Sequence, residues 1–205
     1  MKYLIGIMLI GMLASCGDTT NFKGGIKCDE IDGLERWSKR GDESLSIPSD
    51  YTGIIKSCVD GYIQRTEEWK DGKMNGLERY YNVESGVLVH EVSYKNHRKE
   101  GLSKEYDANG ILIMTVEYKD GFENGSVKKY YQNGQVKSEY IMRDGEGNVE
   151  FSKQYYKNGQ LKSHCIYEET DENVYGFYVV SYDCWDEDGN QIECERTAED
   201  INNDR

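Results

Sequence analysis

The sequence is poor in proline, with one in 205 residues, but it contains 22 glycines and 17 tyrosines. So much tyrosine, in a chain with 37% apolar residues, argues against full disorder and is typical of globular proteins rich in β-structure. Apolar residues at helical spacing are not sustained anywhere after residue 16, so we expect almost no helix.

Positive charge is also scarce, because 25 Lys and Arg residues oppose 38 Asp and Glu residues and the formal net charge is −13. Proteins bind nucleic acid mainly by neutralising phosphates with Lys and Arg, which releases counterions. We therefore expect no nucleic-acid partner. The same deficit disfavours nonspecific binding to anionic lipid head groups.

A short apolar run at residues 4–13 follows the basic residue Lys2. It is too short to span a bilayer core of about 30 Å and is typical of a secretory signal. The segment Leu13-Ala14-Ser15-Cys16 resembles the lipobox of bacterial lipoprotein precursors, which implies cleavage before Cys16 and acylation of that cysteine. An ordinary signal peptide with a chance cysteine is the alternative.

We assign residues 1–15 to a lipoprotein signal peptide and residues 16–30 to the acylated cysteine and a flexible polar tether. Acyl chains such as palmitate hold a protein on a membrane without a transmembrane helix, so a membrane is the first expected partner. For Gram-negative lipoproteins the resemblance implies that Gly17, after the lipidated cysteine, favours the outer membrane. We expect a lipid-anchored protein of the cell envelope.

Turns with a central glycine recur at Gly61, Gly86, Gly110, Gly134 and Gly159, at intervals of 24 or 25 residues. Positions at even offsets from these glycines form columns. The eighth residue after each glycine is Trp69, Tyr94, Tyr118, Met142 or Tyr167, and the sixth is Glu67, Val92, Val116, Tyr140 or Cys165. The second residue after each glycine is Ile63, Leu88, Leu112, Val136 or Leu161. The fourth residue before each of the later glycines is Tyr106, Tyr130 or Tyr155. Because alternate strand residues point to opposite faces, we place these columns on one face and interpret the tyrosines as core.

Three tyrosines lie one position away from these columns: Tyr80, Tyr131 and Tyr156. Alternation places them on the opposite, otherwise polar face. Two large aromatic residues per turn exceed what a one-faced core needs. We therefore hypothesise that the three form one partner-contacting stripe, an idea that fails if they are buried under other segments.

A second turn follows the eighth-residue column, as in Trp69-Lys70-Asp71-Gly72 and Tyr118-Lys119-Asp120-Gly121. Glycine supplies the positive φ of tight hairpin turns, and His97 departs from this pattern. Units of strand, turn, strand and turn, joined head to tail, predict an all-β fold. We expect an elongated antiparallel β-meander of repeated hairpins with a period of about 24 residues.

Two segments carry a family resemblance, residues 101–110 (GLSKEYDANG) and residues 125–139 (GSVKKYYQNGQVKSE). They resemble the bacterial variant of the MORN repeat, as found in YwqK-type proteins, and the likeness extends over about residues 50–168. It implies a fold of hairpin repeats and says little about activity. Residues 33–37 (GLERW) and Trp185 fit degenerate end repeats, so we expect a repeat domain at residues 31–195 and a disordered tail at residues 196–205.

Five cysteines follow Cys16. Cys184 and Cys194 stand five residues on either side of Gly189, on one face of an expected hairpin, so we propose a disulfide between them. Cys28 and Cys58 form a second candidate pair. Cys165 then remains free, and we interpret it as a buried apolar residue and not as a nucleophile.

Catalytic and metal-binding patterns are absent from the sequence. It contains no Gly-x-Ser-x-Gly, no phosphate-binding glycine loop and no Ser/His/Asp arrangement, so we expect neither an enzyme nor a cofactor. The three histidines have no neighbours at metal-ligand spacing, and we expect no zinc. Asp186-Glu187-Asp188-Gly189 resembles part of a calcium loop, but Cys184 stands where the first aspartate belongs, so a hairpin turn is expected there.

The function we expect is protein interaction or scaffolding by the sheet, with a protein partner. Relatives with the MORN variant are often labelled antitoxins. An immunity-like protein that neutralises an envelope-acting toxin is therefore the alternative. Cell-wall glycan binding is a second alternative, because exposed aromatic rings can stack on sugars.

Overall fold

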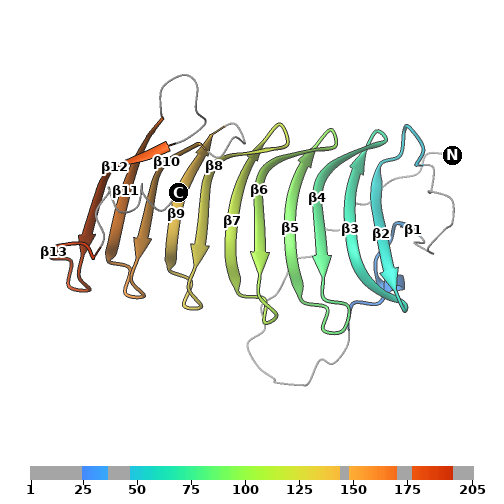
Figure 1. Ribbon diagram of the computed structural model, residues 1–205. Coiled ribbons are helices and arrows are strands. Elements are labelled where there is room, and N and C mark those ends of the chain that lie inside the picture. Colours follow the sequence, from blue (N-terminus) through green and yellow to red (C-terminus); the bar gives the residue numbers. More distant parts are fainter. Residues whose placement is uncertain (1–24, 37–46, 144–147, 170–176, 196–205) are drawn as a thin grey trace.

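The computed structural model describes residues 25–36, 47–143, 148–169 and 177–195, which form one sheet of thirteen strands (Figure 1). The order of the strands in the sheet is their order in the chain. They are β1 (Leu34–Arg36), β2 (Gly53–Val59), β3 (Tyr62–Lys70), β4 (Lys73–Tyr81), β5 (Leu88–Lys95), β6 (Arg98–Tyr106), β7 (Leu112–Lys119), β8 (Phe122–Tyr130), β9 (Val136–Arg143), β10 (Asn148–Tyr155), β11 (Leu161–Glu169), β12 (Phe177–Trp185) and β13 (Gln191–Ile192). The fold is the expected hairpin meander.

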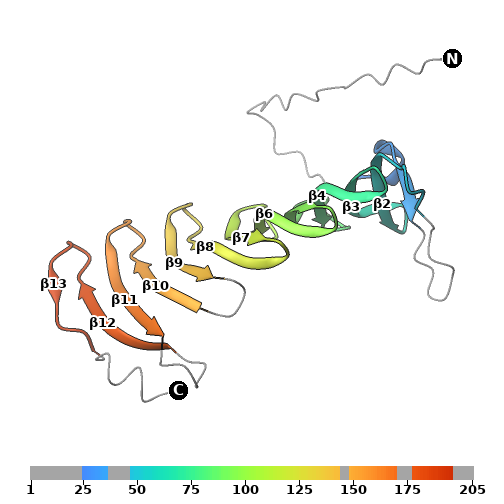
Figure 2. The same ribbon diagram turned by 90° about the horizontal axis from the view of Figure 1, so that it is seen from above.

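The sheet is a single open layer, in which each strand packs against its neighbours in sequence. Figure 2 shows that the strands are bowed and that the sheet twists along its length. A 3₁₀ turn, η1 (Cys28–Glu30), lies beside the N-terminal strands. No helix in the described part of the chain is long and apolar enough to cross a membrane.

The first strand departs from the expected antiparallel pattern. β1 pairs in parallel with β2, with Leu34 opposite Ile55. A parallel pair needs a crossover of a dozen or more residues, and residues 37–52 connect these two strands where a hairpin turn would have to be short. The similarity of residues 33–37 to a later repeat therefore does not make an antiparallel hairpin.

The tight turns have the geometry that the sequence predicts. Consecutive residues have positive φ at Asp60 and Gly61, at Asp71 and Gly72, at Asn96 and His97, and at Asp120 and Gly121. His97 takes up a φ of 68°, in the place that glycine holds in the other units. Paired positive φ values match the right-handed twist of hairpin strands. The turn expected at residues 144–145 lies outside the described residues.

One residue of each strand from β2 to β12 joins a continuous row across one face, which we call the central row. It consists of Ile55, Glu67, Glu78, Val92, Ser103, Val116, Val127, Tyr140, Ser152, Cys165 and Tyr182. Ile55, Val92 and Val127 are each 1% exposed. The core therefore follows the sixth-residue column, whereas the tyrosine columns expected to form it are half-buried.

A recurrent irregularity corrects the expected faces of the columns. The pairing register shifts between Glu105 and Tyr106, and again between Lys129 and Tyr130. An extra residue in one strand moves the following pairs to the other face. The Tyr130 hydroxyl accordingly lies 3.3 Å from Oγ1 of Thr115, whose side chain is on the face opposite the central row. The tyrosines before the turns thus do not share a face with the eighth-residue column.

Candidate functional site

The eighth-residue column lies in one row beside the central row, and we call it the aromatic row. Its members lie on alternate strands of the sheet, and all are half-buried. They are Trp69 on β3, Tyr94 on β5, Tyr118 on β7, Met142 on β9 and Tyr167 on β11. The sequence predicted this column, and the structure brings its members together on one face.

Glycine lies opposite the first four members of the aromatic row. Gly53 pairs with Trp69, Gly76 with Tyr94, Gly101 with Tyr118 and Gly125 with Met142. A large side chain beside a glycine covers backbone that would otherwise be bare. Gly76, Gly101 and Gly125 also have φ values of 130°, 91° and 118°, which glycine adopts without strain.

Two buried carboxylates lie at the N-terminal end of the row. Glu67 and Glu78 are directly opposite one another on β3 and β4, at 1% and 5% exposure. Arg65 forms ion pairs with both, and its Nη1 lies 3.3 Å from Oε1 of Glu78. Nε1 of Trp69 donates to Oε2 of Glu67 at 2.9 Å, and the Tyr80 hydroxyl donates to Oε1 of Glu78 at 3.0 Å. In the sequence, Glu67 stood out only as the one acidic residue of the sixth-residue column.

The guanidinium at this end is fixed by its surroundings. Burial lowers the pKa of Arg65, but the hydrogen bond with Tyr80 and the charges of Glu67 and Glu78 outweigh it and raise the pKa overall. The Arg65 guanidinium also lies over the Tyr80 ring, 5.7 Å from its centre. Arg65 is therefore a permanent cation that lies between the two buried carboxylates.

The hydroxyl groups of Tyr94 and Tyr118 in the aromatic row interact with carboxylates of the protein itself. Burial and the Glu78 carboxylate raise the pKa of Tyr94. Burial, and then Glu123, raises the pKa of Tyr118 to about 12, and its hydroxyl donates to Oε1 of Glu123 at 3.2 Å. These hydroxyls stay protonated as donors, so the rings are what the row offers to a ligand.

The structure does not bring Tyr80, Tyr131 and Tyr156 together in one stripe. Tyr80 lies within β4 on the central-row face, opposite Arg65 and His90. Tyr131 and Tyr156 directly follow β8 and β10 at the hairpin turns. The expected common face is therefore wrong. Tyr80 is the first of two successive tyrosines, whereas Tyr131 and Tyr156 are each the second tyrosine of such a pair. All three are half-buried.

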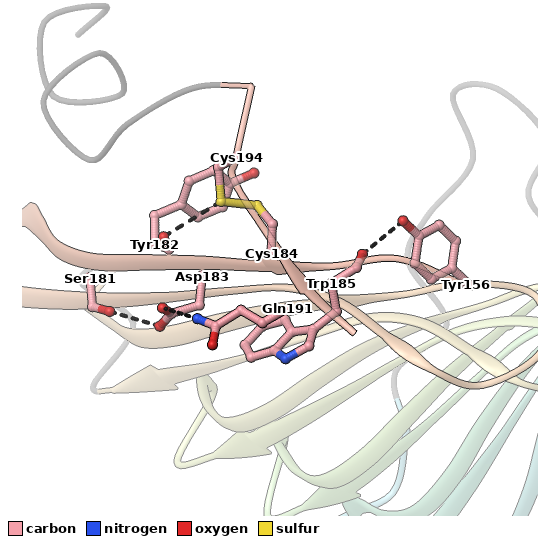
Figure 3. The surroundings of a disulfide bond; sticks show 8 residues. All are labelled: Tyr156, Ser181, Tyr182, Asp183, Cys184, Trp185, Gln191 and Cys194. Atoms are coloured by element: carbon pink, nitrogen blue, oxygen red, sulfur yellow. Dashed lines mark hydrogen bonds between the residues drawn. A yellow bond between two sulfur atoms is a disulfide. The ribbon is translucent and has the colours of Figure 1, made fainter. Parts of the chain in front are cut away.

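Tyr131 and Tyr156 link successive turns. The Tyr131 hydroxyl donates to the carbonyl of Tyr155 at 2.7 Å, and the Tyr156 hydroxyl donates to the carbonyl of Trp185 at 2.9 Å (Figure 3). Their rings lie under Lys137 and Lys162, whose Nζ atoms are 6.0 and 5.6 Å from the ring centres. These tyrosines thus have a structural use, and a contact with a partner stays a prediction.

Comparison with known proteins identifies the unit that repeats. Residues 99–120, 123–144 and 152–169 match the model of the MORN repeat variant. The three segments are similar to MORN repeats. The first comprises most of β6 with β7 and contains the pair Gly101 and Tyr118, and the second contains Gly125 and Met142. A pair of a glycine and a large side chain across two strands is thus internal to the first two of these segments.

No curated protein matches the sequence. Among solved structures, a crystal structure of a mutant of TarM from S. aureus, in complex with fondaparinux, alpha-GlcNAc-glycerol and UDP, is similar at 12% identity over 50% of this chain, with a TM-score of 0.36. A second crystal structure of TarM is similar at 13% identity over 50% of this chain, also with a TM-score of 0.36. This chain spans about one fifth of each TarM chain, 20% and 19% of its length.

Cysteines lie at both ends of the repeat array. Cys184 forms a disulfide with Cys194, the pair proposed from the spacing, with 5.4 Å between their Cα atoms (Figure 3). Cys28 forms a disulfide with Cys58, with 6.2 Å between the Cα atoms, and joins η1 to β2. Cys165 is free and buried in the central row, where burial raises the pKa of its thiol. Cys16, the expected lipidation site, lies outside the described residues.

Metal ligands do not gather in the described part of the chain, where no three His, Cys, Asp or Glu side chains could hold an ion together. Asp186 instead caps its own turn and accepts hydrogen bonds from the backbone N–H groups of Asp188 and Asn190. Hydrogen bonds from Asn190 lower the pKa of this carboxyl. A pocket of about 530 Å³ lies beside η1, lined by residues including Lys56, Asp60 and Tyr62, at the N-terminal end of the sheet.

Proposed function

We propose that this chain is a protein-interaction or scaffolding module and that the aromatic row is its binding surface. The observation that carries the proposal is this row of half-buried large side chains on a sheet of one layer. Tyr and Trp are the side chains that most often dominate binding energy at protein interfaces. Because the twisted sheet is long, successive repeats offer similar contacts along one surface.

The membrane anchor is the second part of the proposal. The lipobox-like residues before Cys16 support attachment of the sheet to a membrane of the cell envelope through acyl chains. Metabolic labelling with a palmitate analogue tests this part. We expect label on the wild type and none on Cys16→Ala, whereas equal labelling of the two overturns the anchor without touching the binding surface.

Site-specific crosslinking tests the binding surface. A photoreactive phenylalanine analogue replaces Tyr118 in the aromatic row or, as a matched control, Tyr106 after the register shift on the opposite face. We expect a defined crosslinked protein from position 118 in cells and none from position 106. Equal crosslinking from both positions, or none from position 118, contradicts the proposed surface.

A further inference from the structure

The pocket beside η1 is built on a corner of the sheet that is cross-linked in three ways. The backbone N–H of Cys28 donates to the carbonyl of Gly61 at 2.9 Å. Lys27 forms an antiparallel bridge with Tyr62, the first residue of β3. The disulfide from Cys28 to Cys58 joins the same segment to β2. These links fix the walls of the pocket in the absence of a ligand, as is usual for small-molecule sites.

Lys56 is a buried cation in the wall of this pocket. The residue is 8% exposed, and its Nζ donates to the carbonyls of Cys28 and Ile31. An ammonium group has three N–H donors, so these two carbonyls leave one donor over. No carboxylate in the described part of the chain forms an ion pair with Lys56.

The two carbonyls do not compensate the charge of Lys56, because they are neutral. A buried charge is costly unless an ion of opposite sign accompanies it. An anionic group bound in the pocket would supply both a counter-charge and an acceptor for the remaining N–H donor.

The other charged residues of the pocket restrict what that anion can be. Asp29 and Asp60 line the pocket and are exposed, and Lys27 is a second, exposed cation. The lining thus contains two cations and two anions. Like charges in the wall disfavour a multivalent anion such as phosphate, whereas a ligand with one group of each sign is complementary to both pairs.

The size of the pocket is suited to a small organic ligand. Its volume of about 530 Å³ lies within the range of about 300–1,000 Å³ that is usual for such sites. Tyr62 is half-buried in the lining and offers apolar ring surface to the body of a ligand.

We propose that this pocket binds a small zwitterion of the class of free amino acids and dipeptides, with its carboxylate at Lys56 and its ammonium group at Asp29 and Asp60. The site is separate from the aromatic row, because Tyr62 begins β3 whereas Trp69 lies near the end of that strand. The inference therefore does not depend on the proposed interaction surface.

Calorimetric titration of the full chain, with its disulfides intact, tests the inference with the dipeptide alanylalanine. Two analogues keep one charge each: the N-acetyl form has no ammonium group, and the C-terminal amide has no carboxylate. We expect alanylalanine to bind and each analogue to bind about tenfold more weakly or worse, because each loses a charge-assisted hydrogen bond.

A matched pair of variants locates the site. Asp60→Asn removes a carboxylate of the pocket at a φ of 52° before Gly61, and Asp120→Asn makes the same change at a φ of 53° before Gly121. Asparagine tolerates positive φ, so both turns keep their conformation. We expect Asp60→Asn to weaken the binding of alanylalanine about fivefold and Asp120→Asn to leave it unchanged.

Lys56→Met should lower the affinity by about tenfold or more, and circular dichroism shows whether this variant keeps its fold. If it does not, the comparison of Asp60→Asn with Asp120→Asn decides. Absence of binding, undiminished binding of either analogue, or equal loss in the two aspartate variants overturns the inference. Tighter binding of inorganic phosphate than of alanylalanine also overturns it, because the pocket would then be an anion site. None of these outcomes affects the aromatic row.

Discussion

At the scale of residues, the pair Glu67 and Glu78 is the main exception to the apolar central row. Burying charge is costly unless each ion has a partner, and these two carboxylates share one guanidinium. Trp69 donates a hydrogen bond to Glu67, and Tyr80 donates one to Glu78. Arg65 is therefore the residue on which the local charge balance depends.

Replacement of Arg65 tests this dependence. We expect Arg65→Met to lower the free energy of unfolding by about 3–5 kcal/mol at neutral pH, because two buried carboxylates lose their cation. Thermal unfolding at neutral pH measures the loss.

The control is Arg98→Met, which removes an exposed arginine near a turn and should change the stability by less than about 0.5 kcal/mol. Equal destabilisation by the two variants would show that Arg65 does not compensate the buried pair.

The aromatic row could be predicted from residue spacing, because its members recur at one offset from a turn glycine. The carboxylate pair could not, since Glu78 meets Glu67 only through the register between two strands. Hydrogen-bond partners of tyrosine hydroxyls, such as Glu123 for Tyr118, also depend on that register. Local pattern determines which face a residue takes only as long as the strand stays regular.

At the scale of elements, the strands are shaped by bulges that contain glycine. Glu117 accepts a hydrogen bond from the backbone N–H of Ser126 at 2.8 Å, next to Gly125. A Cβ at Gly125 would lie within van der Waals overlap of the Glu117 side chain, whereas a Cβ at Gly101 would meet Ser93 at an ordinary 3.7 Å. Alanine at position 101 would therefore introduce backbone strain alone, whereas alanine at position 125 would add a steric clash with Glu117.

Alanine at these two positions tests that separation. Gly101→Ala should lower the free energy of unfolding by about 1–2 kcal/mol through its positive φ alone. Gly125→Ala should cost more, because the Glu117 carboxylate must also move away from the backbone N–H that it caps. Denaturant titration gives both values, and a larger loss for Gly101→Ala would contradict this explanation.

The hairpins and most of their turns were predictable, because glycine and asparagine or aspartate mark positive φ directly in the sequence. The shift at Tyr106 and Tyr130 was not predictable, since it places an extra residue in a strand without a distinctive residue type. The parallel pairing of β1 was hidden by its likeness to a repeat. The position of β1 follows instead from the length of the connection after it.

At the scale of the whole molecule, disulfides close the two ends of the sheet. The Cys28–Cys58 bond spans 30 residues and the Cys184–Cys194 bond spans 10. Loop-closure entropy predicts about 3.6 kcal/mol for the longer loop and about 2.7 kcal/mol for the shorter. Neither bond crosses the repeats between them.

Paired serine variants should show this division. Cys28→Ser with Cys58→Ser should lower the melting temperature more than Cys184→Ser with Cys194→Ser. Hydrogen exchange should rise near the removed bond while β6 to β9 stay protected, because stability in repeat proteins is shared mainly between neighbours. Uniform loss of protection throughout the sheet would show instead that the ends control the centre.

The identity of strand order and chain order has a consequence for how the protein is made. From β2 onward, each new hairpin finds the edge that it joins already formed by the hairpin before it. Assembly can therefore keep pace with a chain that is delivered N-terminus first, and no early strand has to wait for a distant late one.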